Sequence, residues 1–163
     1  MGELLSKIGL NREQREAVRE LAERWGVDEQ TAPYASLLWS GQSTQTLHLD
    51  DVSGIPFLDG VPGMEEYQHR ARVRCGDGDF FAAVTPPAPG YERYCQEVLG
   101  MGAPTFLLAE PVGSVIEVAA ACAQGETFGR LAATLRNEGA LTIHPYMGIH
   151  SVWDLGLKLE QST

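Results

Sequence analysis

The chain has 163 residues, the size of one domain, and its 44% hydrophobic and 21% charged residues are typical of a folded globular protein. Its 22 acidic and 12 basic side chains give a formal net charge of -10 at pH 7, so a nucleic acid or an anionic membrane surface would be repelled and neither is an expected partner. The three cysteines are far apart and form no Cys-x-x-Cys pair, which favours neither a disulfide framework nor a thiolate zinc site. With no export signal and no apolar stretch long enough to span a membrane, we expect a cytoplasmic protein.

Residues 1–61 are predicted to form a helical and loop amino-terminal segment. Apolar side chains between Ala17 and Trp25 recur on one helical face, which predicts a helix over 11–26. A second helix is expected over 28–39. The remainder of the segment is rich in Gly, Pro, Ser, Thr and Asp and is interpreted mostly as loop, with 44–49 as its only plausible strand.

From residue 62 onward, short apolar runs alternate with stretches of helical periodicity. Strands are predicted at DFFAAV, TFLLAE and ALTIHPY, and helices at YERYCQEVLG, SVIEVAAACAQ, ETFGRLAATLRNEG and SVWDLGLKLE. The apolar runs are too short for helices and are typical of buried parallel strands. Alternation of this kind predicts an α/β three-layer sandwich, in which helices cover both faces of a short parallel sheet.

Candidate binding residues follow the predicted strands, because ligands of open parallel sheets bind beyond the carboxyl ends of the strands. The segments TPPAPGY, EPVG and HPY occupy these positions. One interpretation is a shared rim that contacts a small molecule, formed by Thr85, Pro86, Tyr91, His144 and Tyr146. The alternative is structural: the prolines set rigid loop exits, and the tyrosine and histidine side chains pack.

Other motifs favour structure over chemistry. Gly100-x-Gly102 follows a helix rather than a strand, so it is interpreted as a helix end and not as a dinucleotide fingerprint. The acidic turn at 76–79 lacks the remaining ligands of a calcium loop. Cys95 lies on the apolar side of its predicted helix and is expected to pack rather than to attack a substrate. We assign no catalytic residue and no metal ligand.

The second part of the chain resembles a known domain family. The resemblance is carried by PGMEEYQHRARVRCGDGDFFAAVTPPAPGYERYCQEVLGMG, by TFLLAEP and by LTIHPYMGIHSVWDLGLKL. These segments are similar to the pre-ATP-grasp domain that precedes the catalytic module of ATP-grasp carboxylate-amine ligases, especially actinobacterial peptide-ligase-like members. The resemblance extends from Pro62 to Leu159 and implies a Rossmann-like domain over 62–163. In a complete ligase, such a domain would form one wall of the acceptor or carboxylate site.

The resemblance also implies that catalysis takes place in a separate module. Complete ligases of this family use ATP and magnesium to activate a carboxylate, and their catalytic half needs cationic and acidic side chains for the phosphates and the metal. This sequence has only two lysines, Lys7 and Lys158. We therefore expect a non-catalytic domain without a cofactor of its own. It would contact a small-molecule carboxylate or amine and act with an ATP-grasp module in the same or another chain.

Two other functions stay open on the residues alone. One is a free-standing Rossmann-like protein that binds a small molecule or forms a dimer. The other is a small enzyme that uses His144, Asp154 or Cys95, provided that these groups meet in one site.

The closing helix predicts association. Its apolar residues are spread too widely around the helix axis to be buried on one side: Ile149, Val152, Trp153, Leu155, Leu157 and Leu159. We therefore expect a homodimer or a complex with an ATP-grasp chain, with Trp153 near the contact.

Overall fold

The computed structural model describes residues 12–26, 45–58 and 60–163. The chain divides into two compact units, residues 1–43 and 44–163. Within the first unit, α2 (Arg12–Arg24) occupies the place where the periodicity predicts a helix. The helix predicted over 28–39 lies outside the described residues. None of the helices in the described ranges has both the length and the apolar character needed to cross a membrane.

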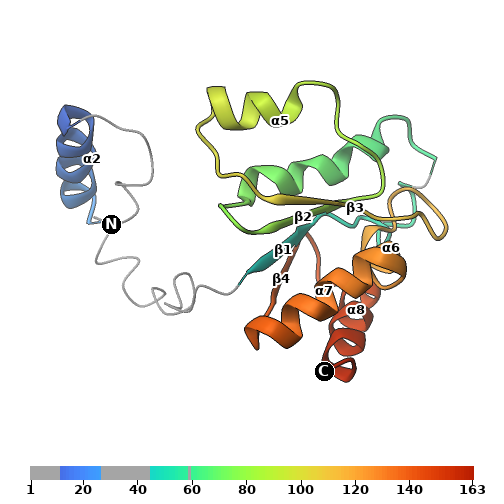
Figure 1. Cartoon of the computed structure of the whole chain (residues 1–163). Coiled ribbons are helices and arrows are strands. Elements are labelled where there is room, and N and C mark those ends of the chain that lie inside the picture. Colours follow the sequence, from blue (N-terminus) through green and yellow to red (C-terminus); the bar gives the residue numbers. More distant parts are fainter. Residues whose placement is uncertain (1–11, 27–44, 59) are drawn as a thin grey trace. The chain divides into compact units, whose positions relative to one another are not determined.

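The second unit is built on a four-stranded parallel sheet (Figure 1). Its strands are β1 (Thr46–Leu49), β2 (Phe80–Ala83), β3 (Thr105–Leu108) and β4 (Thr142–Pro145). Their order across the sheet is β3-β2-β1-β4. The strands predicted from the short apolar runs are all present. The sheet is parallel because helical crossovers connect these strands, as the alternation predicts.

β1 is a central strand of this sheet and not part of an amino-terminal segment. Its Leu47 lies in register with Phe80 of β2 and with Ile143 of β4. The compact unit accordingly begins at Thr44, whereas the sequence analysis places the boundary between residues 61 and 62. The loop-rich segment after β1 connects this strand to η2, the first helix of the same unit.

Helices cover both faces of the sheet, so the unit is a three-layer, Rossmann-like α/β sandwich (Figure 1). One face carries the 3₁₀ helix η2 (Met64–Arg74) and the helix α5 (Tyr91–Arg93), which continues as the π-helical turn η3 (Tyr94–Val98). The other face carries α6 (Val118–Cys122), α7 (Gly125–Glu138) and α8 (His150–Gln161).

The helix η2 is not among the helices predicted from the sequence. A 3₁₀ helix has three residues per turn, so its side chains do not follow the 3.6-residue period of an α-helix. Its buried side chains are also mostly polar: Gln68, His69, Ala71 and Arg72. No apolar stripe marks it in the sequence.

The main apolar core lies between the sheet and α6, α7 and α8. Leu47 and Leu49 of β1 point to this side, together with Leu107 of β3 and Leu131 of α7. Successive side chains of a strand alternate between faces, so His48 points to the opposite side, toward η2. The alternation gives the two faces of β1 different chemistry.

The helix α8 is only partly buried, as its apolar pattern predicts. Val152, Leu155 and Leu159 are buried, while Trp153 and Leu157 are 67% and 53% exposed. The helix therefore contributes to the core on one side and leaves two large apolar side chains in contact with solvent.

The acidic turn at 76–79 holds the starts of neighbouring strands. The Asp79 carboxylate accepts hydrogen bonds from the backbone N–H of Gly76 at 2.8 Å and of Thr46 at 3.1 Å. Asp77 accepts one from the N–H of Ala103 at 2.7 Å. These carboxylates are thus used by the backbone, in agreement with the structural interpretation of this turn.

Candidate functional site

The sheet has a topological switch point between β1 and β4. From β1 the chain continues to β2 and β3 on one side, while β4 pairs with the other edge of β1. Ligands of open α/β sheets bind beyond the carboxyl ends of the strands at such a point. Asp50 and Asp51 follow β1 here, and Tyr146 follows β4. We therefore take this corner as the candidate functional site.

On the α8 side, the switch point is filled by structural contacts. The fully buried Asp51 carboxylate accepts hydrogen bonds from the N–H of Ala119 at 2.7 Å and from the N–H and hydroxyl of Ser53 at 2.9 and 2.6 Å. The hydroxyl of Ser151 lies 3.5 Å away. Asp51 thus connects the end of β1 with α6 and α8.

The loop after β1 also packs directly on the loop before α8. A Cβ atom placed on Gly54 would lie 2.6 Å from Cγ2 of Ile149, which is too close for any side chain. The position requires glycine because the two loops meet there.

On the η2 side, Asp50 forms a buried ion pair. Its carboxylate is fully buried and accepts hydrogen bonds from both terminal nitrogens of Arg74, at the end of η2. The charge of Asp50 is therefore compensated within the fold, as burial of a carboxylate requires. No group of three or more His, Cys, Asp or Glu side chains in the described ranges could hold a metal ion.

On the same helix as Arg74, a second arginine lies over the rings of two tyrosines. The guanidinium carbon of Arg70 lies 4.1 Å from the ring centre of Tyr67 and 5.1 Å from that of Tyr146. The two tyrosine rings are 5.5 Å apart and meet edge to face. We call these three residues the arginine–tyrosine cluster. It joins η2 to the carboxyl end of β4.

A histidine pair lies under the same face of the sheet, within the strands rather than beyond their ends. The rings of His48 on β1 and His144 on β4 are 5.1 Å apart, and Nε2 of His48 is 3.3 Å from the Asp79 carboxylate. Burial lowers the pKa of His48, and the nearby Asp79 opposes this effect only in part. The carboxylate can only accept, so Nε2 carries the proton. Nδ1 of His48 is buried without a hydrogen-bond partner in the described structure.

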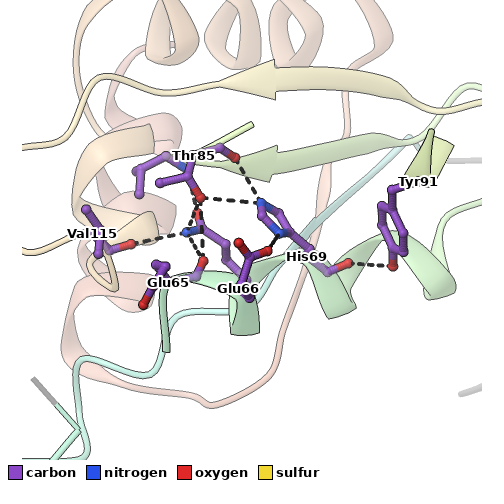
Figure 2. A network of polar contacts seen from close by, with 8 residues as sticks. Glu65, Glu66, His69, Thr85, Tyr91 and Val115 are labelled. Atoms are coloured by element: carbon purple, nitrogen blue, oxygen red, sulfur yellow. Dashed lines mark hydrogen bonds and ion pairs between the residues drawn. The ribbon is translucent and has the colours of Figure 1, made fainter. Parts of the chain in front are cut away.

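A second polar network lies at the carboxyl end of β2 (Figure 2). The buried Gln68 amide on η2 accepts a hydrogen bond from the N–H of Val84 at 2.6 Å and donates to the hydroxyl of Thr85 at 2.9 Å. It also lies 3.4 Å from the carbonyl of Val115. A single side chain thus connects η2, the end of β2 and the segment before α6.

His69 completes this network, and both of its ring nitrogens are occupied. Nδ1 is 2.8 Å from the Glu66 carboxylate, and Nε2 donates to the carbonyl of Thr85 at 2.9 Å (Figure 2). The hydroxyl of Tyr91 donates to the carbonyl of His69 at 3.1 Å. The pKa of Tyr91 is raised to about 12, mainly by burial and secondly by the neighbouring Cys95. A general base needs a free nitrogen in reach of a substrate, so His69 positions η2 rather than transferring protons.

The five predicted site residues fall into two groups. Thr85 and Tyr91 meet around His69, and Pro86 is exposed next to Thr85. His144 and Tyr146 lie on the β4 side, with β1 between the groups. No hydrogen bond, ion pair or ring contact in the described ranges joins the two groups, so the single rim expected from the sequence is divided by η2 and β1.

The residues suggested for a small enzyme also lie apart. Cys95 is buried in η3, Asp154 pairs with His150 at 3.4 Å on α8, and His144 contacts His48 on β4. α8 and η3 cover opposite faces of the sheet. These three side chains therefore do not form one catalytic group.

Sequence reasoning missed the most polar part of the switch point. Asp50 and Asp51 directly follow the run Thr44–Leu49, so treating this run as a strand of the sheet would have placed them at its carboxyl end. Tyr67 and Arg70 are three residues apart, the spacing that aligns side chains in a 3₁₀ helix, but nothing in the sequence marks that helix.

The fold and its polar side chains are the basis for assigning a function. The fold is Rossmann-like, and its polar groups gather at the carboxyl ends of β1, β2 and β4. Comparison with protein-family models, with curated proteins and with solved structures gave no match.

Proposed function

We propose that this chain is the non-catalytic amino-terminal domain of an ATP-grasp carboxylate-amine ligase, in which it forms one wall of the substrate site. The observation that carries the proposal is the Rossmann-like sheet with a polar switch point between β1 and β4. A domain of this class is what the resemblance over Pro62 to Leu159 implies. The complete enzyme would join a carboxylate to an amine with the consumption of ATP.

The polar groups are already hydrogen-bonded within the fold, which favours a wall of the substrate site over a reaction centre. Asp51 is held by backbone and hydroxyl donors, Asp50 by Arg74, and His69 by Glu66 and the carbonyl of Thr85. Each group would have to break native hydrogen bonds before it could transfer a proton or attack a substrate. Such groups instead maintain the shape of a surface.

ATP and magnesium do not fit the described side chains of this chain. Phosphates need a cradle of cations or helix N-terminal amides, and magnesium needs free carboxylate oxygens. Lys158 donates to the carbonyl of Ala123 at 3.2 Å, and Asp50 and Asp51 are already used by the fold. We assign both groups to the ATP-grasp module.

The proposal gives the exposed side of α8 a role in contacting that module. Trp153 and Leu157 are four residues apart, so they lie on the same side of the helix, and both are largely exposed. Aromatic side chains in such positions are frequent anchors of protein interfaces. A homodimer through the same residues is the competing outcome.

The test is ATP turnover by the full chain together with the ATP-grasp protein encoded in the same gene or beside it. ADP release should require both proteins, a carboxylate and an amine, whereas calorimetry should detect no binding of Mg-ATP to this chain alone. Trp153→Ala should lower the turnover of the mixture. Val98→Ala is the matched control, because Val98 is also 67% exposed but lies on η3, on the other face of the sheet.

Turnover at the same rate without this chain would overturn the proposal, as would tight binding of Mg-ATP by the chain alone. The alternative is a free-standing Rossmann-like binding protein, which the compactness of the unit 44–163 favours. A gene neighbourhood without an ATP-grasp module would support that alternative. Sedimentation at micromolar concentration would then show whether Trp153 mediates a homodimer.

A further inference from the structure

The arginine–tyrosine cluster has the geometry of a recognition site. Tyr67 and Arg70 both belong to η2, and side chains three residues apart are aligned in a 3₁₀ helix. The guanidinium therefore lies over the Tyr67 ring, 4.1 Å from its centre. Tyr146 comes from the first position after β4 and approaches the same guanidinium at 5.1 Å. Two elements distant in sequence thus hold one cationic group in place.

Contact with two aromatic rings and a hydrogen bond with the Tyr67 hydroxyl restrict the guanidinium. A guanidinium has five N–H donors, so this one hydrogen bond leaves others for a ligand. The Tyr67 and Tyr146 hydroxyls add polar atoms nearby. The hydrogen bond between them is the main cause of the raised pKa of Tyr67. The cluster can therefore present oriented donors to an incoming group.

Arg70 differs from the two other arginines in the second half of η2. Arg72 pairs with Glu92 and Arg74 pairs with Asp50. In the described ranges no carboxylate lies within ion-pair distance of Arg70. The charge of the neighbouring Asp50 is already compensated by Arg74, so the positive potential at Arg70 remains available for a ligand.

The cluster also occupies the place where this fold binds ligands. Tyr146 immediately follows β4, and Arg70 lies on the helix that follows β1, so both border the switch point. On the α8 side of this corner, Asp51 is hydrogen-bonded to Ala119 and Gly54 packs against Ile149. The arginine–tyrosine cluster lies on the η2 side of the same corner.

We propose that the arginine–tyrosine cluster binds the carboxylate group of a small organic molecule. The planar guanidinium matches the two oxygens of a carboxylate, and the tyrosine rings offer apolar surface to the carbon atoms beside it. A phosphate group carries more charge and usually requires several cations, but here one guanidinium is available in a chain of formal net charge -10. The inference rests on the proposed function, for which it names the substrate group that this wall holds.

The test is titration of the full chain, labelled with ring-¹³C tyrosine, with phenylacetate and with its neutral analogue phenylacetamide. Phenylacetate should shift the ring signals of Tyr67 and Tyr146 in a saturable manner, with half-saturation below about 10 mM. Phenylacetamide should leave both signals unchanged. The signals are assigned with Tyr67→Phe and Tyr146→Phe.

Two variants of Arg70 separate recognition from folding. Arg70→Gln should weaken the binding of phenylacetate at least about tenfold, and Arg70→Lys should weaken it less, because an ammonium keeps the charge but loses the planar pair of donors. Arg130→Gln is the matched control, since Arg130 is an exposed arginine on α7, on the other face of the sheet. Melting curves establish that each variant is folded.

Equal shifts with phenylacetamide, or full binding by Arg70→Gln, would overturn the inference. The same holds for an absence of saturation up to about 50 mM. Inorganic phosphate is titrated in parallel, and tighter binding of phosphate at these two tyrosines would replace the carboxylate with a phosphate ligand. Because the chain is tested alone, the two proposals can fail separately. Carboxylate binding by this chain, together with no ATP turnover in the mixture, would retain this site and remove the ligase function.

Discussion

The two faces of the sheet bury different kinds of side chain. Against α6, α7 and α8, the buried residues form one continuous apolar cluster that includes Leu47, Leu131 and Leu155. Under η2, the apolar cluster is small and consists of Ala71, Cys75, Phe81 and Ala83. Several polar or charged side chains are also buried on that face: His48, Asp50, Gln68, His69 and Arg72.

This difference means that one face mainly stabilises the fold, while the other mainly positions the side chains of the switch point. Burial of apolar surface is favourable in many arrangements because it is not directional, whereas buried hydrogen bonds and ion pairs require specific distances. The α8 face should therefore provide most of the free energy of folding. The η2 face should determine where the side chains of the switch point lie, at a smaller gain in stability.

Truncation of a buried side chain should cost most on the apolar face. Leu155→Ala removes a fully buried side chain of α8 and should lower the free energy of unfolding by ~2–5 kcal/mol, as measured by chemical denaturation. Leu157→Ala on the same helix is the control. Leu157 is 53% exposed, so its loss should stay within about 0.5 kcal/mol. Similar costs for both variants would contradict the observed orientation of α8.

A smaller effect is expected for the principal ion pair of the η2 face. The buried Arg72 donates twice to Glu92 at 2.6 Å and once to the carbonyl of Gly102 at 2.8 Å. Arg72→Met should cost about 1–3 kcal/mol at pH 7. This is less than the cost of Leu155→Ala, because the Glu92 side chain is already 46% exposed and can regain water. Thermal and chemical denaturation measure the difference.

The same ion pair predicts that the stability of the fold depends on pH in the acidic range. The hydrogen bond from Arg72 lowers the pKa of Glu92, so the folded state favours the ionised carboxylate. The contribution is present above the ordinary pKa of 4.5 and is lost as the pH falls through the lower folded value. The cost of Arg72→Met should therefore be smaller near pH 3 than at pH 7. An unchanged cost would argue against the pair.

His48 provides a pH test within the polar face itself. Its pKa is lowered from 6.5 chiefly by burial, so the folded state disfavours the protonated ring. Stability should be retained above pH 6.5 and decrease as the pH falls from there through the folded pKa, by at most ~1.4 kcal/mol per pH unit. The unfolding free energy of His48→Gln should depend less on pH over this window.

The exposed His150 of α8 supplies the control for this measurement. Its side chain is 92% exposed, so His150→Gln removes a histidine without changing the buried groups around His48. If His48→Gln and the parent lose stability equally on acidification, the histidine pair does not contribute to the pH response.

The two faces should also differ in the rate of thiol labelling. Burial raises the pKa of Cys75 on the η2 face and of Cys122 on the α6 face to about 12, so neither should react at pH 8 without local opening. The η2 face has fewer apolar contacts and should open more readily. Mass spectrometry after labelling with iodoacetamide should find Cys75 modified several-fold faster than Cys122. Faster labelling of Cys122 would reverse the proposed ranking of the two faces.

Strands and helices with an apolar signal could be predicted from the sequence. The runs around Phe81, Leu107 and Ile143 are apolar and too short for helices, and each is a strand. Leu131 and Leu155 lie in segments with helical periodicity, and both are buried in helices. Their positions follow from local patterns, because one buried side requires one regular spacing of apolar residues.

The candidate site could be predicted only in part. Tyr146 is named from its place after a strand, and it belongs to the arginine–tyrosine cluster. Thr85 and Tyr91 were expected to share a rim with it, but they contact His69 on the other side of η2. Arg70 was not named at all. Its role depends on a 3₁₀ helix that buries polar side chains and therefore leaves no apolar pattern.

Local sequence patterns therefore predict the α/β class, the parallel strands and the helices of the apolar face. Only the folded chain shows that β1 lies in the centre of the sheet, that η2 covers the polar face, and that Tyr67, Arg70 and Tyr146 meet at the switch point. This division follows from the range of the interactions. Periodic burial is recorded in neighbouring residues, whereas ion pairs and stacked rings form between segments that only the folded chain brings together.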